Sequence, residues 1–419
     1  MKNIKYYVTL VIACILVFFP IIWHDFQTHW DDQWMVVNRY TEDGITMDNI
    51  RYVFKNFYNG QYGPINQLVY TSIYTFFGYN PAIFHLYSLL LHIINCCLLF
   101  MFLNYIVAGF KPQTKPSAIA FAATLLFAVH PLQVESVAWI SASKIPLYTF
   151  FTLLALLSYI RFVSAQKTGF YLSSFLFFLC AFGSKEQSIV LPATLLLLDW
   201  VLRRNCIHAG SINWAPLILE KIPFILFALF AALFTQVNQS MEYSQVAGFP
   251  FGQRLVFTCY SLVIYAKRFL LPANLMYLYP FPISSGDDLP ALYLIYPIVI
   301  ATTLILLCIY IKKIPRPVIF GLLFYIINMA LMLHIVPMNR FMITADRYVY
   351  FASAGLFFIA SWYAVPWLQN IAPIRKKWMI TIVAFYLLYL GSYAHIRSHA
   401  WKNSETLKRN FFEKIRQES

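Results

Sequence analysis

Long apolar runs separated by short polar connections dominate this chain. The runs are 6–23, 82–109, 117–130, 137–160, 170–183, 187–202, 222–237, 255–272, 291–311, 317–336, 348–368 and 378–395. Each is near the length that an α-helix needs to cross a bilayer or half of one. Hydrophobic residues make up 60% of the 419 positions and charged residues 11%, far from the composition of a soluble globular protein. The pattern therefore predicts an all-α polytopic membrane protein.

Basic residues predict how the runs are oriented. They cluster at Lys111/Lys115, Arg161/Lys167, Arg203/Arg204, Lys312/Lys313/Arg316 and Arg375/Lys376/Lys377. These clusters fall on one side of the membrane if the runs alternate and 255–272 does not cross. We therefore expect 255–272 to be re-entrant or interfacial, which leaves about eleven transmembrane helices. The amino terminus is then cytoplasmic and the carboxyl terminus is outside, with 6–23 retained as an anchor because no small-residue cleavage site follows it.

The domain organisation follows from this topology. Residues 1–395 are expected to form one transmembrane domain, and 396–419 a short tail on the outer side. The first outer loop, 25–80, is long for a connection. It contains two amphipathic patterns, near 48–58 and after Pro64, which predict helices on the outer surface of the membrane.

An acidic cluster follows the first apolar run directly, in the segment from His24 to Asp32. With the expected topology, every acidic residue except Asp199 and Glu220 lies on the outer side. Membrane insertion sorts Lys and Arg strongly but Asp and Glu hardly at all, so the sorting of the acids needs another cause. An outward-facing active site would supply one. The alternative is that long outer loops simply contain more polar residues.

Other polar groups stand where apolar runs end. They are His85, His130, Glu135, Lys185, Glu186, Asp346, Arg347 and Tyr348. Ionisable groups at the edge of a membrane segment are functional candidates by default. Turns, helix anchors and helix packing are the structural alternatives. Lys185 and Glu186 could form an ion pair with each other, but because adjacent side chains rarely face each other, we expect them to have different partners.

Several classes of function are not indicated. The chain has neither a Gly-x-x-x-x-Gly-Lys loop nor a Gly-x-Gly-x-x-Gly turn, so the substrate is expected to arrive in the membrane. The net charge of +14 reflects topogenic Lys and Arg, and nucleic acid is not an expected partner. The seven cysteines never form a Cys-x-x-Cys pair and are expected to be core residues, neither a disulfide framework nor a metal site.

Three motifs resemble a known family. They are His130-Pro131-Leu132-Gln133-Val134-Glu135 with Trp139, Ser184-Lys185-Glu186 with Leu198-Asp199-Trp200, and Ala345-Asp346-Arg347-Tyr348 with Gly355. Together they resemble the membrane region of O-mannosyltransferases that carry tetratricopeptide repeats. That family belongs to the integral-membrane glycosyltransferases of the GT-C fold, as do the protein O-mannosyltransferases. The Asp31-Asp32 pair stands where this class keeps its acidic motif, in the first outer loop.

The resemblance implies the GT-C fold, a polyprenyl-phosphate sugar donor and a protein Ser or Thr acceptor, with mannose as the sugar. The family usually continues into repeats on the outer side, whereas this chain ends after 396–419, so we expect a relative that lacks them. Residues 142–145 resemble bacterial relatives more than animal ones. The expected location is the bacterial inner membrane, with the active site facing the periplasm.

The chemistry assigns roles to the candidates. Sugar transfer to a hydroxyl needs a carboxylate to take the proton and cations to stabilise the departing phosphate. We assign the first role to the Asp31/Asp32 pair, with Asp31 favoured as base and Asp32 orienting it or binding a metal. The donor phosphate is assigned to Arg347, Lys185 and His130. The residues expected to bind or orient substrate are Glu135, Glu186, Asp346, Tyr348 and His85.

Two alternatives stay open for metal binding. Either no metal is bound, or Asp32 and His29 hold Mg²⁺ or Mn²⁺. The leading hypothesis is an inverting single displacement, because a general base without a covalent intermediate inverts the anomeric centre. A lipid or envelope glycan acceptor is the alternative within this class. A flippase would be expected to show inverted repeats and polar groups near the midplane, and a scaffold would leave the acidic cluster unexplained.

Overall fold

The computed structural model describes residues 3–58, 60–204, 213–238, 248–337, 340 and 342–418. Every regular element within these ranges is a helix, and only two isolated β-bridges occur, Tyr58 with Gln61 and Tyr279 with Thr344. The predicted all-α class is therefore confirmed. Cys206 lies outside the described residues.

Five helical segments are long and apolar enough to cross a membrane. They are Ile4–Trp23, Pro81–Gly109, Ile140–Ala165, Ala291–Lys313 and Pro373–Trp401. A sixth is obtained if Pro116–Val129 and Pro131–Ala138, which meet at a bend of 56°, form one broken span. Three apolar helices are shorter, Thr168–Ser184, Ile222–Asn238 and Arg316–Met332. These segments indicate a multi-pass membrane protein, while the GT-C fold and the expected count of about eleven spans remain predictions.

The central bundle is built from helices that pack along one another over much of their length. They are α1 (Ile4–Phe18), α6 (Pro81–Gly109), α7 (Pro116–Val129), α9 (Lys144–Ala165), α10 (Thr168–Ser184), α16 (Arg316–Met329), α17 (Ser353–Asn370) and α18 (Pro373–Ser398). The main pairs are α9 with α10, α6 with α7, and α17 with both α7 and α16. Helices α16 and α17 approach closely at two glycines, since a Cβ on Gly321 would lie 2.7 Å from the Gly355 carbonyl oxygen.

Further helices and 3-10 turns lie outside the bundle and the first loop. They are α8 (Val134–Ala138), α11 (Leu191–Val201), α12 (Ala215–Glu220), α13 (Ile222–Asn238), α14 (Phe251–Leu270), α15 (Ile295–Tyr310) and α19 (Ser404–Glu418), with 3-10 turns η2 (Pro131–Gln133), η3 (Ile140–Ser143), η4 (Glu186–Val190), η9 (Ala330–Met332) and η10 (Asp346–Val349). The expected re-entrant segment 255–272 falls on α14, which packs against α15 and is not among the candidate spans.

The first loop contains four helices, α2 (Asp32–Met35), α3 (Arg39–Glu42), α4 (Met47–Lys55) and α5 (Pro64–Phe77). Both helices expected in this loop are present, as α4 and α5. Local caps explain where two of the helices begin: the Asn38 side chain accepts the Thr41 N–H, and Thr46 accepts the Asn49 N–H. Helix α5 lies against α10 at Gly183, where an added Cβ would come within 2.8 Å of Ile65.

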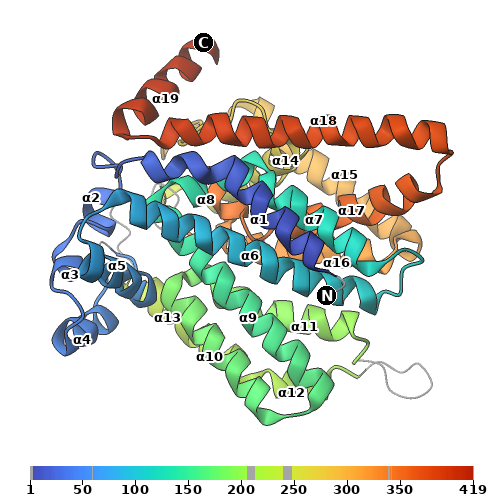
Figure 1. Ribbon diagram of the computed structural model, residues 1–419, viewed down its shortest axis with the longest axis horizontal. Helices are drawn as coiled ribbons and strands as arrows, with labels where there is room; N and C mark the ends of the chain where they lie inside the picture. Colours follow the sequence, from blue (N-terminus) through green and yellow to red (C-terminus); the bar gives the residue numbers. More distant parts are fainter. Residues whose placement is uncertain are drawn as a thin grey trace.

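The molecule has two distinct ends. Helices α2 to α5 gather at one end, where α18 also passes into α19 (Figure 1). The described start of α1 and the connection from α17 to α18 lie toward the other end (Figure 1). We call the first of these the loop end. The basic clusters lie away from it: Lys111/Lys115 in the connection between α6 and α7, and Arg375/Lys376/Lys377 in the first turns of α18.

The topology can be tested with cysteines placed at Lys313 and Glu405. We expect opposite accessibility to a membrane-impermeant thiol reagent in sealed vesicles, with Glu405 on the loop-end side. A cysteine at Lys376 serves as a control that should label together with Lys313. Labelling of Lys313 and Glu405 from the same side would refute the topology.

Candidate active site

A polar cavity at the loop end collects charged side chains from segments far apart in the chain. Its charged lining residues are Asp31, Lys144, Lys185, Glu186, Arg340 and Arg347. Tyr348 and Trp139 also line it. The structure therefore brings together five residues that the sequence singled out, Asp31, Lys185, Glu186, Arg347 and Tyr348. Two further cations, Lys144 and Arg340, join them.

Asp31 is the carboxylate of the first loop that faces this cavity. It directly precedes α2, and its backbone carbonyl accepts the N–H groups of Trp34 and Met35 at 3.1 and 2.8 Å. Burial raises the pKa of Asp31 above its ordinary value, and the positive charges of Lys144 and Arg347 partly offset this rise. The carboxylate is thus more basic than an exposed aspartate while facing two cations.

The Asp32 side chain does not face the cavity and forms structural hydrogen bonds. One of its oxygens accepts the Ser141 backbone N–H at 3.0 Å and the Ser141 hydroxyl, and the other accepts the Gln27 N–H at 2.7 Å. The residue is fully buried. Burial raises the pKa of Asp32, and the hydrogen bonds from Ser141 and Gln27 oppose this rise. Asp32 therefore ties the first loop to η3, and its carboxylate does not line the cavity.

The residues considered for a metal do not converge on one point. His29 is exposed, with Nδ1 3.4 Å from the Thr28 hydroxyl, whereas the oxygens of Asp32 are buried in backbone hydrogen bonds. Among the residues that the structure describes, the group with metal-like spacing is Cys14, His92 and Cys96. Both ring nitrogens of His92 already have partners there, the Tyr350 hydroxyl at 2.8 Å and the Ala128 carbonyl at 3.2 Å. We interpret this group as a packed core cluster.

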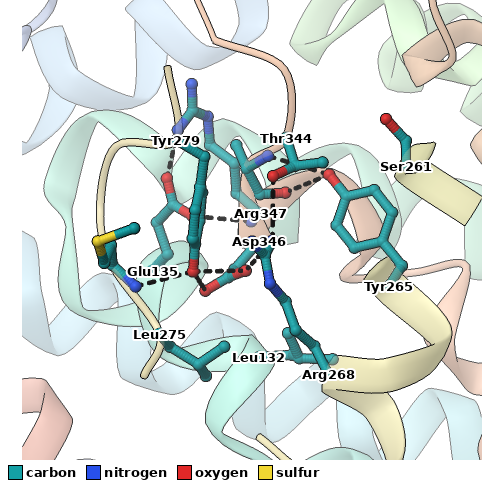
Figure 2. A network of polar contacts seen from close by, with 12 residues as sticks. Leu132, Glu135, Ser261, Tyr265, Arg268, Leu275, Tyr279, Thr344, Asp346 and Arg347 are labelled. Carbon is teal, nitrogen blue, oxygen red and sulfur yellow. Dashed lines mark hydrogen bonds and ion pairs between the residues drawn. The ribbon is translucent and has the colours of Figure 1, made fainter. Parts of the chain in front are cut away.

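Arg347 is held in place by Glu135 from α8. The two form a buried ion pair, and a second Glu135 oxygen accepts the Arg347 backbone N–H at 3.0 Å (Figure 2). The guanidinium also lies 5.1 Å from the centre of the Trp139 ring and 4.9 Å from that of Tyr348. Although burial alone would lower the pKa of Arg347, Glu135 raises it. Arg347 is therefore a fixed and permanently charged residue in the lining of the cavity.

Lys185 and Glu186 correct an expectation from the sequence. We expected different partners for these neighbours, but Lys185 Nζ lies 2.7 Å from Glu186 Oε1. The bend from α10 into η4 turns the two side chains toward each other. Burial opposes ionisation of Glu186, but the adjacent Lys185 lowers its pKa. The pair presents an ammonium group and a carboxylate together to the cavity.

Asp346 lies outside the cavity lining and binds residues from other segments. Its carboxylate binds Arg397 at 2.7 Å and Arg268 at 3.4 Å, and the Tyr279 hydroxyl donates to it at 3.3 Å. Figure 2 shows this network of α14, η10 and the Tyr279 segment beside the Glu135–Arg347 pair. Asp346 thus positions η10, and with it Arg347, and does not line the cavity.

Two predicted histidines also lie outside the cavity lining. His130 is buried, where its Nδ1 accepts the Leu132 N–H and its Nε2 lies 3.2 Å from the Phe269 carbonyl. His85 is buried against the ring of His24, with 5.8 Å between the ring centres. The structure thus places both as packing groups close to the bundle core.

Sequence reasoning missed Lys144 and Arg340. Lys144 Nζ donates to Gln61 Oε1 at 2.7 Å and lines the cavity beside Asp31. The sequence did indicate Lys144 as a candidate, because a lysine inside the apolar run 137–160 is an ionisable group within a membrane segment. Arg340 had no local signal: it belongs to an irregular connection, and its guanidinium binds the carbonyls of Met332 and Leu331 in η9.

Comparison with known proteins shows a distant similarity to two proteins. The protein O-mannosyl-transferase TMTC1 of Homo sapiens is 35% identical over 132 residues, and that of Mus musculus is 34% identical over 132 residues. The match covers 29% of this chain but only 14% and 13% of those two proteins. No family model matches the chain. The chain is thus distantly similar, over part of its length, to protein O-mannosyltransferases.

The different environments of the two adjacent aspartates predict different effects on stability. Asp32→Ala leaves buried donors of Ser141 and Gln27 without an acceptor, so we expect a loss of about 3 kcal/mol in unfolding free energy. Asp31→Ala is the matched control and should cost much less. Thermal unfolding in detergent measures both, and an equal loss in the two variants would contradict the assignment.

Proposed function

We propose that this chain is a membrane glycosyltransferase that transfers mannose from a polyprenyl-phosphate donor to a hydroxyl group, that of a protein Ser or Thr. The observation that carries this proposal is one cavity in which Asp31 faces Lys144, Lys185 and Arg347. A carboxylate opposite several cations supplies what the reaction needs at its two ends, a proton acceptor and a stabilised leaving phosphate.

The proposed step is a single displacement. The acceptor oxygen attacks the anomeric carbon while its proton passes to the Asp31 carboxylate. The bond between the anomeric carbon and the phosphate oxygen breaks, and polyprenyl phosphate leaves with the bonding electrons. Lys185 and Arg347 stabilise the negative charge that grows on the phosphate. One displacement inverts the anomeric centre, so a β-linked donor gives an α-linked product.

An apolar groove next to the cavity supports a lipid-linked donor. It is lined by residues of α5, α10 and α13, among them Ile65, Leu176 and Phe230. Tyr62 lines both the groove and the polar cavity. A donor with its phosphate beside Lys185 can therefore extend its isoprenoid chain into the groove. Aliphatic and aromatic walls favour such a chain through burial of apolar surface.

The similarity to protein O-mannosyltransferases supports the choice of mannose and of a protein hydroxyl. A glycan or lipid hydroxyl would satisfy the same chemistry. We further propose that the protein resides in a bacterial inner membrane, with the loop end in the periplasm, where acceptors would meet the cavity.

Two variants separate the chemical step from donor binding. Asp31→Asn should lower kcat by at least 100-fold with unchanged donor affinity, because the loss of a general base affects the transition state. Lys185→Met should weaken donor binding about tenfold through loss of a charge-assisted contact. Arg347 suits this test less well, because its truncation would leave the fully buried Glu135 unpaired, whereas Glu186, the partner of Lys185, is partly exposed. Lys167→Met, an exposed lysine away from the cavity, is the control.

The assay uses purified protein, a labelled polyprenyl-phosphate mannose and a Ser/Thr peptide. Donor affinity is measured separately by equilibrium binding, and the product linkage is determined by NMR. Full activity in Asp31→Asn, or a product with retained anomeric configuration, would overturn the single-displacement mechanism.

The rate should also depend on pH in a defined direction. Asp31 accepts a proton only as a carboxylate, so kcat/KM rises with pH through the pKa of Asp31, which burial raises above its ordinary value. Lys144 lowers that pKa, and Lys144→Met should therefore move the acidic limb of the profile to higher pH. The exposed Lys111→Met is the control and should leave the limb in place. A shift of the limb to lower pH in Lys144→Met would contradict this electrostatic coupling.

A further inference from the structure

A second cleft lies within the first loop, beside the polar cavity. Aromatic rings line it, from Tyr40, Tyr52, Phe57 and Tyr58. Side-chain amides line it as well, from Asn56, Gln61, Asn66 and Gln67. All of the lining residues that the structure describes are uncharged. This lining differs sharply from the charged cavity next to it and indicates a neutral ligand.

The rings form a continuous wall. Tyr40 stacks on Tyr52 with 5.0 Å between ring centres and an angle of 21°, and Tyr58 meets Tyr40 edge-on at 5.2 Å and 88°. Tyr52 is 39% exposed, and the Arg39 guanidinium lies 5.2 Å from the centre of its ring. Stacked tyrosines of this kind present rigid apolar faces with hydroxyl groups at their edges.

One amide in the cleft lacks a partner. Asn66 is only 3% exposed, and its Oδ1 has no hydrogen-bond partner in the structure. Leaving a buried carbonyl oxygen unpaired is costly, and such groups in native proteins need an explanation. A ligand that donates an N–H or O–H group into the cleft would supply the missing bond.

The cleft adjoins the proposed catalytic cavity. Gln61 lines both the cleft and the cavity, and its Oε1 accepts a hydrogen bond of 2.7 Å from the Lys144 ammonium group. The backbones of Tyr58 and Gln61 exchange two hydrogen bonds of 2.9 Å, which hold these two lining residues together. On the other side, Trp34 packs against Tyr58 and hydrogen-bonds the Asp31 side chain. A ligand in the cleft therefore ends next to the proposed base.

We infer that this cleft binds the acceptor as an extended, uncharged polypeptide segment, with the Ser or Thr hydroxyl reaching Asp31. The inference rests on the proposed function and extends it to the acceptor. Extended segments dock on aromatic-lined grooves with little loss of conformational entropy, especially where proline is present. Their backbone N–H groups suit the unpaired carbonyl of Asn66, and an uncharged lining offers no partner for charged side chains.

Direct binding tests the cleft without requiring catalysis. The probe is a fluorescent, uncharged peptide with prolines flanking one Thr, added to the full chain in nanodiscs without donor. Tyr52→Ala and Asn66→Leu should each raise its Kd about tenfold, and unfolding temperatures verify that both variants are folded. Tyr74→Ala is the matched control, a tyrosine of α5 that does not line the cleft, and should leave the Kd unchanged. Donor affinity should be the same in all four proteins.

The outcomes separate the cleft from the chemistry. Peptide binding that is lost in both cleft variants supports the inference even if no sugar is transferred, which would count against the proposed function alone. Transfer to the peptide with an unchanged KM in both variants would overturn the cleft while leaving the transferase in place. Transfer to an oligosaccharide acceptor but not to the peptide would overturn the polypeptide assignment.

Discussion

Compensation of buried charge is the constraint on which the loop end of this molecule depends. Asp346 is fully buried and must be paired, and it binds Arg397 of α18 and Arg268 of α14. Removal of both arginines would leave the Asp346 carboxylate uncompensated in a medium of low dielectric constant. These pairs hold η10 against two helices from distant parts of the chain. The next residue, Arg347, is thereby placed at the cavity, where it forms an ion pair with the buried Glu135.

A second anchor acts from the opposite wall. Asp32 accepts three hydrogen bonds from Ser141 and Gln27, and these fix the first loop onto the turn that precedes α9. Because successive residues in this turn point in different directions, the anchor also determines where Asp31 points. Because the Asp32 carboxylate forms these structural hydrogen bonds, the neighbouring Asp31 carboxylate remains available to a ligand. The hydrogen bonds of Asp32 thus help to position the neighbouring base.

Sequence reasoning identified four of the six charged residues that line the cavity, for a physical reason. Charged groups cannot be left in the apolar interior of membrane helices, so they gather where apolar runs end. Asp31, Lys185 and Arg347 stand at such ends. Lys144 stands within a run and was therefore overlooked, although its position was the signal. His130 and His85 satisfied the same rule but pack in the protein interior, because the end of an apolar run can also lie in the packed core.

The sequence by itself determined the helical class, the multi-pass character, the helical first loop and the segments from which a site could be built. These are local properties, since apolar length and 3.6-residue periodicity depend on neighbours along the chain. The tertiary structure alone decided which of the two adjacent aspartates faces the cavity, and that Lys185 pairs with Glu186. It also decided that Glu135 binds an arginine 212 residues away. Such choices depend on the packing of distant segments, where the direction of one side chain is set by whichever partner neutralises its buried charge.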